Sequence, residues 1–373
     1  MTLKPLISLT LALTLLGAGA AQAQFFQDPA LQALLSAEKF AEMDSLASQR
    51  TAARADDAQA VLGGALAAMS ERGGPAQREA AIRQAEACVR LAPQAAECHY
   101  ALGLVLGAHA MSQGMVKIAA SIGSIKTALL ESMKLAPQWY PARSAVVEFY
   151  LLAPGMLGGS ESKALEAARA APRPDQVRAL EARVALADGR FDAAIAGLAT
   201  VRPGADDPLA DDVQQWQAAA AFGLLGKGQA AQARPVFERM AREQPALAIG
   251  PYGLGRLLLE QGDAAEAVKR LEQARGLKGA GVLPIDYRLG MAWQAQGQTA
   301  AAKAALGRFV AAGKGSPKAL DDARKRLAQL GAAAGRSPGA VSAPGWPARC
   351  WAGSRPRRWR DRFAAPHPAA ARP

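Results

Sequence analysis

One pattern occurs three times in the second half of the chain: Gly228-Gln229-Ala230-Ala231-Gln232-Ala233, Gly262-Asp263-Ala264-Ala265-Glu266-Ala267 and Gly297-Gln298-Thr299-Ala300-Ala301-Ala302. The last alanines of these stretches, at positions 233, 267 and 302, lie 34 and then 35 residues apart. A period of this size is typical of a helical hairpin that is used repeatedly, rather than of one globular core. The pattern therefore predicts an array of hairpins that binds a partner and catalyses no reaction.

The small residues of the pattern have separate physical tasks. In the middle unit, Leu254-Gly255 belongs to a first helix, Gly262 to the turn, and Ala267 and Leu271 to a second helix. Glycine and alanine let the two helices approach closely, and the turn glycine supplies a backbone conformation that other residues resist. The next unit carries the matching residues Leu289, Gly290, Gly297, Ala302 and Leu306.

This pattern resembles the tetratricopeptide repeat family. The resemblance rests on the Leu-Gly pair, the turn glycine, the alanine of the second helix, the large apolar residue four positions later and a closing proline such as Pro245. It covers roughly residues 50–330 and is strongest over residues 209–313. The resemblance implies an all-α, right-handed superhelical solenoid of about six to seven helix-turn-helix repeats, ending in a C-terminal capping helix.

Composition and charge agree with a solvated helical body. The net charge is +12, but residues 331–373 hold eight Arg and one Asp, and Lys4 adds one more positive charge, which leaves +4 for the body. A charge of this size is weak support for a polyanionic partner, and no nucleic-acid partner is predicted. Because alanine is abundant and alternating β-type runs are absent, we expect a nearly all-α body.

The chain divides into six segments. Residues 1–23 have the features of a cleavable signal peptide, with Lys4 before an apolar run and Ala21-Gln22-Ala23 at the cleavage point after Ala23. We therefore expect a periplasmic or secreted protein without a transmembrane segment after cleavage. The other segments are a helical lead-in at 24–56, irregular repeat-like hairpins at 57–208, a regular array at 209–315, a capping helix at 316–331 and a disordered tail rich in Arg, Pro and Ala at 332–373.

Two of these segments depart from the family pattern. Gly103 and Pro137 lie 34 residues apart, where the family spacing is about 24, so about ten residues within 107–124 lengthen one hairpin. The tail allows two hypotheses: an unselected extension of the gene, or a basic Trp–Arg segment that touches membrane or nucleic acid. The first is favoured by the abrupt change of composition after Leu330.

The chain offers little material for catalysis or metal binding. Cys88 and Cys98 lie on helices expected to be antiparallel neighbours, so they can form a disulfide in an oxidising compartment or serve as small apolar fillers. Cys98, His99 and His109 lack a fourth ligand at a metal-like spacing. We predict no metal, no cofactor and no catalytic residue, so the chain is not expected to be an enzyme.

The face that the resemblance implies for binding is a concave groove lined by the first helices. Three tyrosines share one register of these helices, and tyrosine suits peptide recognition because it combines an apolar ring with a polar tip, although packing explains the same register. The predicted groove consists of Tyr100, Gln215, Phe222, Tyr252, Arg256, Glu260, Tyr287, Met291 and Gln294. The expected function is that of a periplasmic scaffold or adaptor for a protein or peptide of the cell envelope. The alternative is an envelope accessory protein that binds a glycan or small ligand in polysaccharide export or solute uptake.

Overall fold

The computed structural model describes residues 25–70, 73–203 and 208–334. The chain has two compact units, with the boundary in the sequence after Leu330. The helices described here belong to the first unit, except for the last turn of the final helix, which belongs to the second. Within these ranges the chain is built from α-helices, and its β pairing is one isolated bridge between Leu247 and Lys278. No helix of the described ranges is long and apolar enough to cross a membrane. The predicted signal peptide (1–23) and residues 335–373 of the predicted tail lie outside them, whereas residues 332–334 of that tail belong to the last helix.

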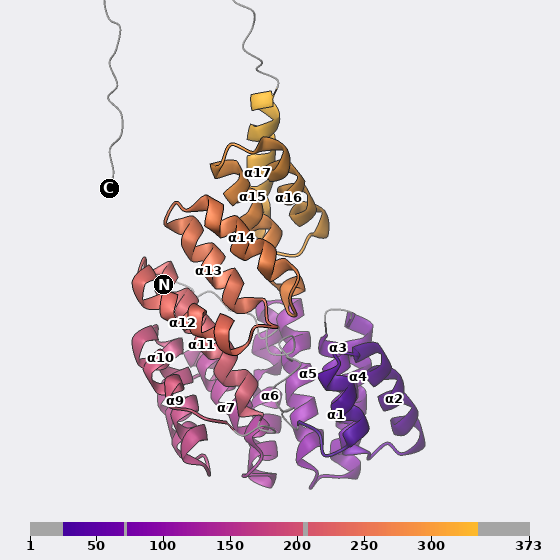
Figure 1. The fold of residues 1–373 in the computed structure, drawn as a ribbon. Coiled ribbons are helices and arrows are strands. Elements are labelled where there is room, and N and C mark those ends of the chain that lie inside the picture. Colours follow the sequence, from indigo (N-terminus) through magenta and orange to yellow (C-terminus); the bar gives the residue numbers. More distant parts are fainter. Residues whose placement is uncertain (1–24, 71–72, 204–207, 335–373) are drawn as a thin grey trace, which may run out of the picture. The chain divides into compact units, whose positions relative to one another are not determined.

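The helices follow one another as antiparallel pairs (Figure 1). Their bounds are α1 Pro29–Ser36, α2 Phe40–Ala53, α3 Ala58–Met69, α4 Pro75–Leu91, α5 Ala96–Gln113, α6 Met115–Leu135, α7 Tyr140–Leu152, α8 Glu161–Arg169, α9 Pro174–Ala187, α10 Phe191–Ala199, α11 Leu209–Gly226, α12 Ala230–Glu243, α13 Ile249–Glu260, α14 Ala264–Arg275, α15 Ile285–Ala295, α16 Thr299–Ala312 and α17 Pro317–Ala334. Two short 3-10 turns, η2 Gly155–Leu157 and η3 Ala280–Val282, lie between pairs.

The pairs stack so that each helix contacts its neighbours in the chain. The first helices of the pairs, called A helices here, are α1, α3, α5, α7, α9, α11, α13 and α15, and the second helices, called B helices, are α2 to α16 with even numbers. A helices of consecutive pairs also contact each other, as for α9 with α11 and α11 with α13. This two-layered stack confirms the predicted all-α solenoid. Pairs α3/α4 to α15/α16 are seven in number, and α1/α2 precede them as a further pair.

Close approach within a pair depends on the glycine of the A helix. A Cβ atom added to Gly255 would lie 2.7 Å from Leu271 Cγ, and one added to Gly290 would lie 2.5 Å from Leu306 Cγ. Both leucines are fully buried, as is Ala302 one turn earlier on α16. The tasks assigned to these positions from the sequence are therefore confirmed: the space beside each glycine is filled by the leucine of the facing B helix.

The turns of the regular pairs use glycine for its backbone freedom. Gly262 and Gly297 have φ angles of +87° and +72°, in the left-handed region that other residues rarely adopt. Each directly precedes the N-cap residue of a B helix, and the Asp263 side chain accepts a hydrogen bond from the Glu266 N–H there. Turn glycine and cap together fix where each B helix begins.

The lengthened hairpin consists of helix throughout. Helix α5 has 18 residues and α6 has 21, whereas α13 and α14 have 12 each. A single residue, Gly114 with a φ of +90°, joins α5 to α6. The extra residues predicted within 107–124 therefore extend both helices beyond their neighbours. At their tip, Met115 and Val116 are exposed to 52% and 83%.

Two features fasten the stack. Cys88, near the end of α4, and Cys98, near the start of α5, form a disulfide with a Cα–Cα distance of 5.6 Å, so the second and third pairs are covalently linked. At the other end, Ser316 caps α17 by accepting a hydrogen bond from the Ala319 N–H. Ala323 and Leu330 of α17 are buried in a cluster with Phe309.

Replacing Gly290 by alanine should lower the free energy of unfolding by about 1–3 kcal/mol, because the new methyl group overlaps Leu306. The matched control is Gly307→Ala in the same pair, where an added Cβ meets nothing within 4 Å. There the better helix propensity of alanine should raise stability by up to about 1 kcal/mol. Denaturant unfolding followed by circular dichroism compares the two, and equal effects would contradict the close-approach account.

Replacing both Cys88 and Cys98 by alanine should cost about 2–3 kcal/mol of stability, because the disulfide closes a short loop in the unfolded chain. A reducing agent should lower the melting temperature of the unmodified protein to that of the double variant. The double variant should not respond to the reducing agent, and a response would assign the effect to another cause.

Candidate functional site

The A-helix layer curves toward itself between the fourth and sixth pairs. Tyr140 and Ser144 of α7 donate hydrogen bonds from their hydroxyl groups to Asp212 Oδ2 of α11, at 2.5 and 2.9 Å. Helix α9 lies between α7 and α11 in the stack, since it contacts both. Side chains that meet across an intervening helix require the layer to be concave here.

This contact places two carboxyl groups in an unusual environment. Burial raises the pKa of Asp212 to about 6, and the hydrogen bonds from Tyr140 and Ser144 lower it only in part. Burial also raises the pKa of the neighbouring Asp211 to about 6, partly offset by the charge of Lys278. Although Asp212 keeps some contact with solvent, the surrounding protein makes its charged form costly.

Ion pairs cross the same layer. Glu148 of α7 accepts two hydrogen bonds from the Arg183 guanidinium of α9, and both side chains are mostly buried. Lys278, in the loop after α14, lies 3.4 Å from Glu38 in the loop between α1 and α2. Glu38 has a φ of +55°, an uncommon conformation for a residue other than glycine. The Glu38–Lys278 pair joins the first pair of helices to the seventh.

Tyr100, the first of the predicted groove tyrosines, is enclosed by other aromatic rings. It is 7% exposed, its ring centroid lies 4.9 Å from that of Trp139, and the Phe25 ring lies 5.9 Å from it and 6.1 Å from Trp139. Phe25 precedes α1, so the chain itself covers this part of the predicted groove. Tyr100 is therefore not available to a ligand in this arrangement.

The predicted groove residues of α11 and α13 form a mixed aromatic and charged surface. The Phe222 ring lies 5.8 Å from Tyr252 and carries the Arg256 guanidinium 5.5 Å above its face. Arg256 Nε in turn donates to Glu260 Oε1 at 2.9 Å, and the two side chains are 23% and 37% exposed. Tyr252 is 4% exposed and serves as the floor of this group. We call Phe222, Arg256 and Glu260 the α11–α13 surface.

Two of the remaining predicted groove residues, Tyr287 and Gln294, contact the last helix. Tyr287 Oη donates to Asp322 Oδ2 of α17 at 2.8 Å, and Gln294 Oε1 accepts from Arg326 of the same helix at 2.8 Å. Met291, on the same A helix, has its sulfur 3.8 Å from an Arg288 nitrogen. Helix α17 thus occupies the register that a further A helix would take. Gln215 lies half-buried on α11.

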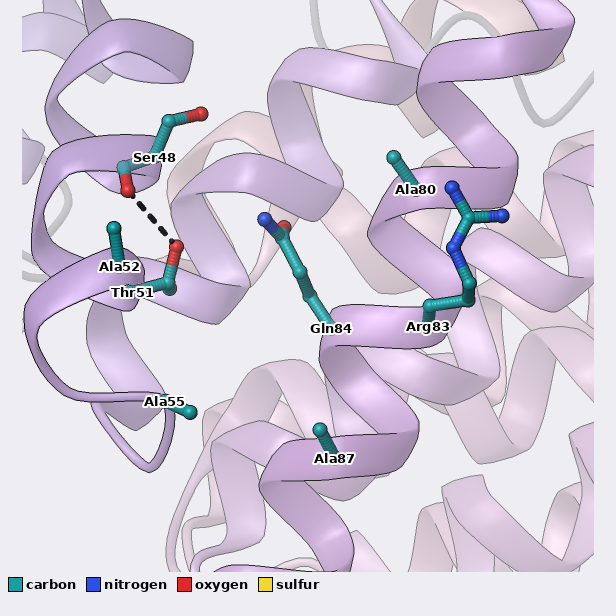
Figure 2. A pocket seen from close by; sticks show the side chains of 8 residues that line it. All are labelled: Ser48, Thr51, Ala52, Ala55, Ala80, Arg83, Gln84 and Ala87. Carbon is teal, nitrogen blue, oxygen red and sulfur yellow. Dashed lines mark hydrogen bonds between the residues drawn. The ribbon is translucent and has the colours of Figure 1, made fainter.

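A separate hollow lies in the B layer. It has a volume of about 380 Å³ between α2 and α4, and Figure 2 shows its lining side chains, Ser48, Thr51, Ala52, Ala55, Ala80, Arg83, Gln84 and Ala87. The Thr51 hydroxyl is already satisfied by the carbonyls of Ala47 and Ser48. Four of the eight lining residues are alanines, and the polar ones offer one cation, Arg83, and no carboxylate.

The acidic, cysteine and histidine side chains of the described residues were the candidates for metal binding or proton transfer. None of them forms a group of three His, Cys, Asp or Glu side chains that could hold a metal ion. Asp212 is one of two carboxyls whose pKa is raised to about 6, but its hydrogen-bond partners are the hydroxyl groups of Tyr140 and Ser144, which serve to join α7 and α11. Ser160, after the Gly-rich loop, uses its hydroxyl to cap α8 at the Lys163 N–H.

Sequence reasoning missed Phe25 and Trp139 as parts of the face. Trp139 directly precedes α7, and Phe25 lies upstream of the first helix, so neither falls in the helical register from which the groove was predicted. It also missed that Asp212 is enclosed, since an acid in the first turn of a helix ordinarily faces solvent and complements the helix dipole. The feature of the sequence that could have pointed to this environment is the pair of adjacent carboxyls, Asp211 and Asp212.

Asp212→Asn should flatten the dependence of stability on pH. The folded-state pKa of Asp212, about 6, lies above the ordinary value of 3.8. Its protonated form therefore stabilises the fold at low pH, and this contribution is lost as the pH rises through about 6. Between about pH 4.5 and 7.5 the unmodified protein should lose about 2 kcal/mol more than the variant. Asp321→Asn, at an exposed carboxyl of α17, is the control, and an unchanged pH profile in Asp212→Asn would contradict this account.

Comparison with known proteins agrees with this architecture. A family model described as a tetratricopeptide repeat matches residues 224–279, which include the turn between α11 and α12 and the whole of α13 and α14. No curated protein sequence matches the chain. Among solved structures, yeast Tom70 is similar with 12% identity and a TM-score of 0.51, over 84% of this chain and 69% of that chain.

Two further structures are similar at a lower level. A tetratricopeptide repeat protein from Parabacteroides merdae shares 10% identity with a TM-score of 0.43, over 70% of this chain and 96% of that one. Human IFIT1, solved as a dimer with PPP-AAAA, shares 13% identity with a TM-score of 0.46 over 73% of this chain, which spans 63% of the IFIT1 chain. The matched repeat segment at residues 224–279, the Tom70 likeness and the stacked helix pairs show that this chain has the fold of tetratricopeptide repeat proteins.

Proposed function

We propose that this protein is a periplasmic scaffold that holds a protein or peptide partner against the α11–α13 surface. The observation that carries the proposal is the cation stacked on a partly buried aromatic ring, Arg256 over Phe222, with Glu260 beside it. Tetratricopeptide repeats are scaffolds for protein partners, and aromatic and arginine side chains dominate the energetics of such interfaces.

The choice of this surface follows from what the other A helices already contact. Tyr100 is covered by Phe25, and Tyr287 is bonded to α17. Asp212 is engaged by α7. On α11 and α13, by contrast, the charged groups contact each other and remain open to solvent, with Glu260 37% exposed. A partner can therefore add contacts there without first breaking a connection within the stack.

The charges of the surface favour a polar or mixed partner segment. Arg256 and Glu260 form an i,i+4 pair on one helix, which is worth only about 0.3–0.5 kcal/mol at an exposed site. A partner carboxylate can therefore draw Arg256 away from Glu260 at small cost. An extended peptide that offers one carboxylate and one apolar side chain would satisfy both Arg256 and the Phe222 ring.

The proposed location rests on the signal-type pattern of residues 1–23 and on the cysteines. Disulfides persist in oxidising compartments such as the bacterial periplasm, and the Cys88–Cys98 pair is joined. The location is tested by fractionating cells into periplasmic and cytoplasmic pools, and recovery in the cytoplasm alone would contradict it.

Arg256→Ala should weaken partner capture about tenfold, since an interface arginine that loses its contacts commonly costs more than about 1 kcal/mol. The measurement is chemical crosslinking of the purified protein in envelope extract, with adducts quantified by mass spectrometry. Tyr252→Ala and Tyr287→Ala are poor probes, because both tyrosines pack within the stack.

The matched control is Arg242→Ala, at a cation 71% exposed on the B helix α12. Its adducts should equal those of the unmodified protein, and both variants should keep their helicity. Adducts that persist unchanged in Arg256→Ala would reject the α11–α13 surface, while equal losses in both variants would indicate non-specific charge attraction.

A further inference from the structure

Residues 25–28, called the N-terminal segment here, lie against A helices as a bound peptide would. The Gln59 side chain of α3 accepts hydrogen bonds from the backbone N–H groups of Gln27 and Asp28, at 3.0 and 3.3 Å. The N–H groups of Phe25 and Phe26 are taken by the side chain of Gln32, at 2.7 and 2.9 Å. Two glutamine oxygens therefore satisfy four consecutive backbone donors of a stretch that is not helical.

Gln59 is held in place for this contact by a third helix. Its Nε2 donates to Glu97 Oε1 of α5 at 3.0 Å, so the amide oxygen is left to face the segment. Binding of a main chain by an oriented side-chain amide does not depend on the sequence of the bound stretch. Discrimination between sequences then falls to the pockets that receive its side chains.

The side chain of Phe25 supplies this discrimination. Its ring lies 5.9 Å from Tyr100 of α5 and 6.1 Å from Trp139 at the start of α7, and those two rings are 4.9 Å apart. Edge-to-face contacts of this kind favour an aromatic ring over an aliphatic group of equal size. Phe26, by contrast, is 2% exposed and belongs to the core.

The segment has its charged anchor at Asp28. Asp28 caps α1 through the N–H groups of Ala30 and Leu31 and accepts a hydrogen bond from Arg50, which also holds Asp57 at the start of α3. Before Asp28, Phe25 contacts the A face through its ring and through the hydrogen bond from its N–H to Gln32 of α1. The Phe25 side chain can therefore leave the two rings while Asp28 keeps α1 fixed.

We propose that Tyr100 and Trp139 form a second peptide site, specific for an aromatic side chain of an extended segment, and that Phe25 is its tethered occupant. The site is distinct from the α11–α13 surface and does not depend on the function proposed for that surface. A peptide from a partner that offers a Phe, Tyr or Trp side chain in an extended stretch competes with Phe25 for the same ring contacts.

A tethered occupant weakens the apparent affinity of any competitor. An occupant joined to its site by a few residues acts at an effective concentration in the millimolar range. The intact chain should therefore bind a free aromatic peptide poorly, and removal of the Phe25 ring should expose the affinity of the site itself.

The test uses a fluorescent peptide with the sequence of residues 24–29, Gln-Phe-Phe-Gln-Asp-Pro, titrated with the full chain and followed by fluorescence anisotropy. Phe25→Ala should bind this peptide about tenfold or more tightly than the unmodified chain. Adding Trp139→Ala to that variant should abolish the gain. A peptide with alanine in place of both phenylalanines should bind neither protein.

Two further variants keep the test decisive. Phe25→Leu vacates the aromatic contacts but keeps an apolar group, so it replaces Phe25→Ala if that variant loses helicity, and it should show a smaller gain. Arg256→Ala should bind the peptide as the unmodified chain does, which separates this site from the α11–α13 surface. A folded Phe25 variant with no gain, or a gain that survives Trp139→Ala, would overturn the proposal.

Discussion

Close approach between the two helices of each pair is the constraint on which this structure depends. At Gly255 and Gly290 any side chain would overlap the leucine of the facing B helix, so the spacing within the pair is set by the absence of a Cβ atom. Since consecutive pairs stack through the same layers, a wider spacing within one pair would also displace its interface with the next pair. The buried alanines of the B helices, Ala267 and Ala302, extend the same requirement.

The A face that results is not a uniform groove. In the N-terminal half it is filled from within: Phe25 covers Tyr100, and Asp212 reaches across α9 to Tyr140. Around α13, by contrast, Arg256 and Glu260 contact each other and stay partly open to solvent. Aromatic and hydrogen-bonding groups are thus used in one half to bind the chain to itself and in the other to present a surface.

The sequence predicted what depends on local spacing. The turn at Gly262, the facing pair of Gly255 and Leu271, and the cap of the last helix at Ser316 all follow from residues within one repeat. The fate of the groove tyrosines did not, because Tyr100 and Tyr287 are covered by elements outside the repeat register, residue 25 and α17. A repeat pattern defines which side of a helix faces inward, but not what the rest of the chain places there. The burial of Asp212 could not be predicted for the same reason, because its partners Tyr140 and Ser144 belong to α7, outside its own repeat.

The contact between Glu38 and Lys278 has a consequence for how the molecule opens. Solenoids normally interact only between neighbours, so their ends fray one unit at a time. Here the loop between α1 and α2 is tied to the loop after α14, and the Lys278 backbone also bonds to Ala246 and Ala248. An ion pair of this exposure adds at most about 1 kcal/mol, enough to bias the order of events without preventing them. Amide hydrogens of α15 and α16, which lie beyond the tie, should therefore exchange with solvent before those of the first pair, although both stand near an end of the stack.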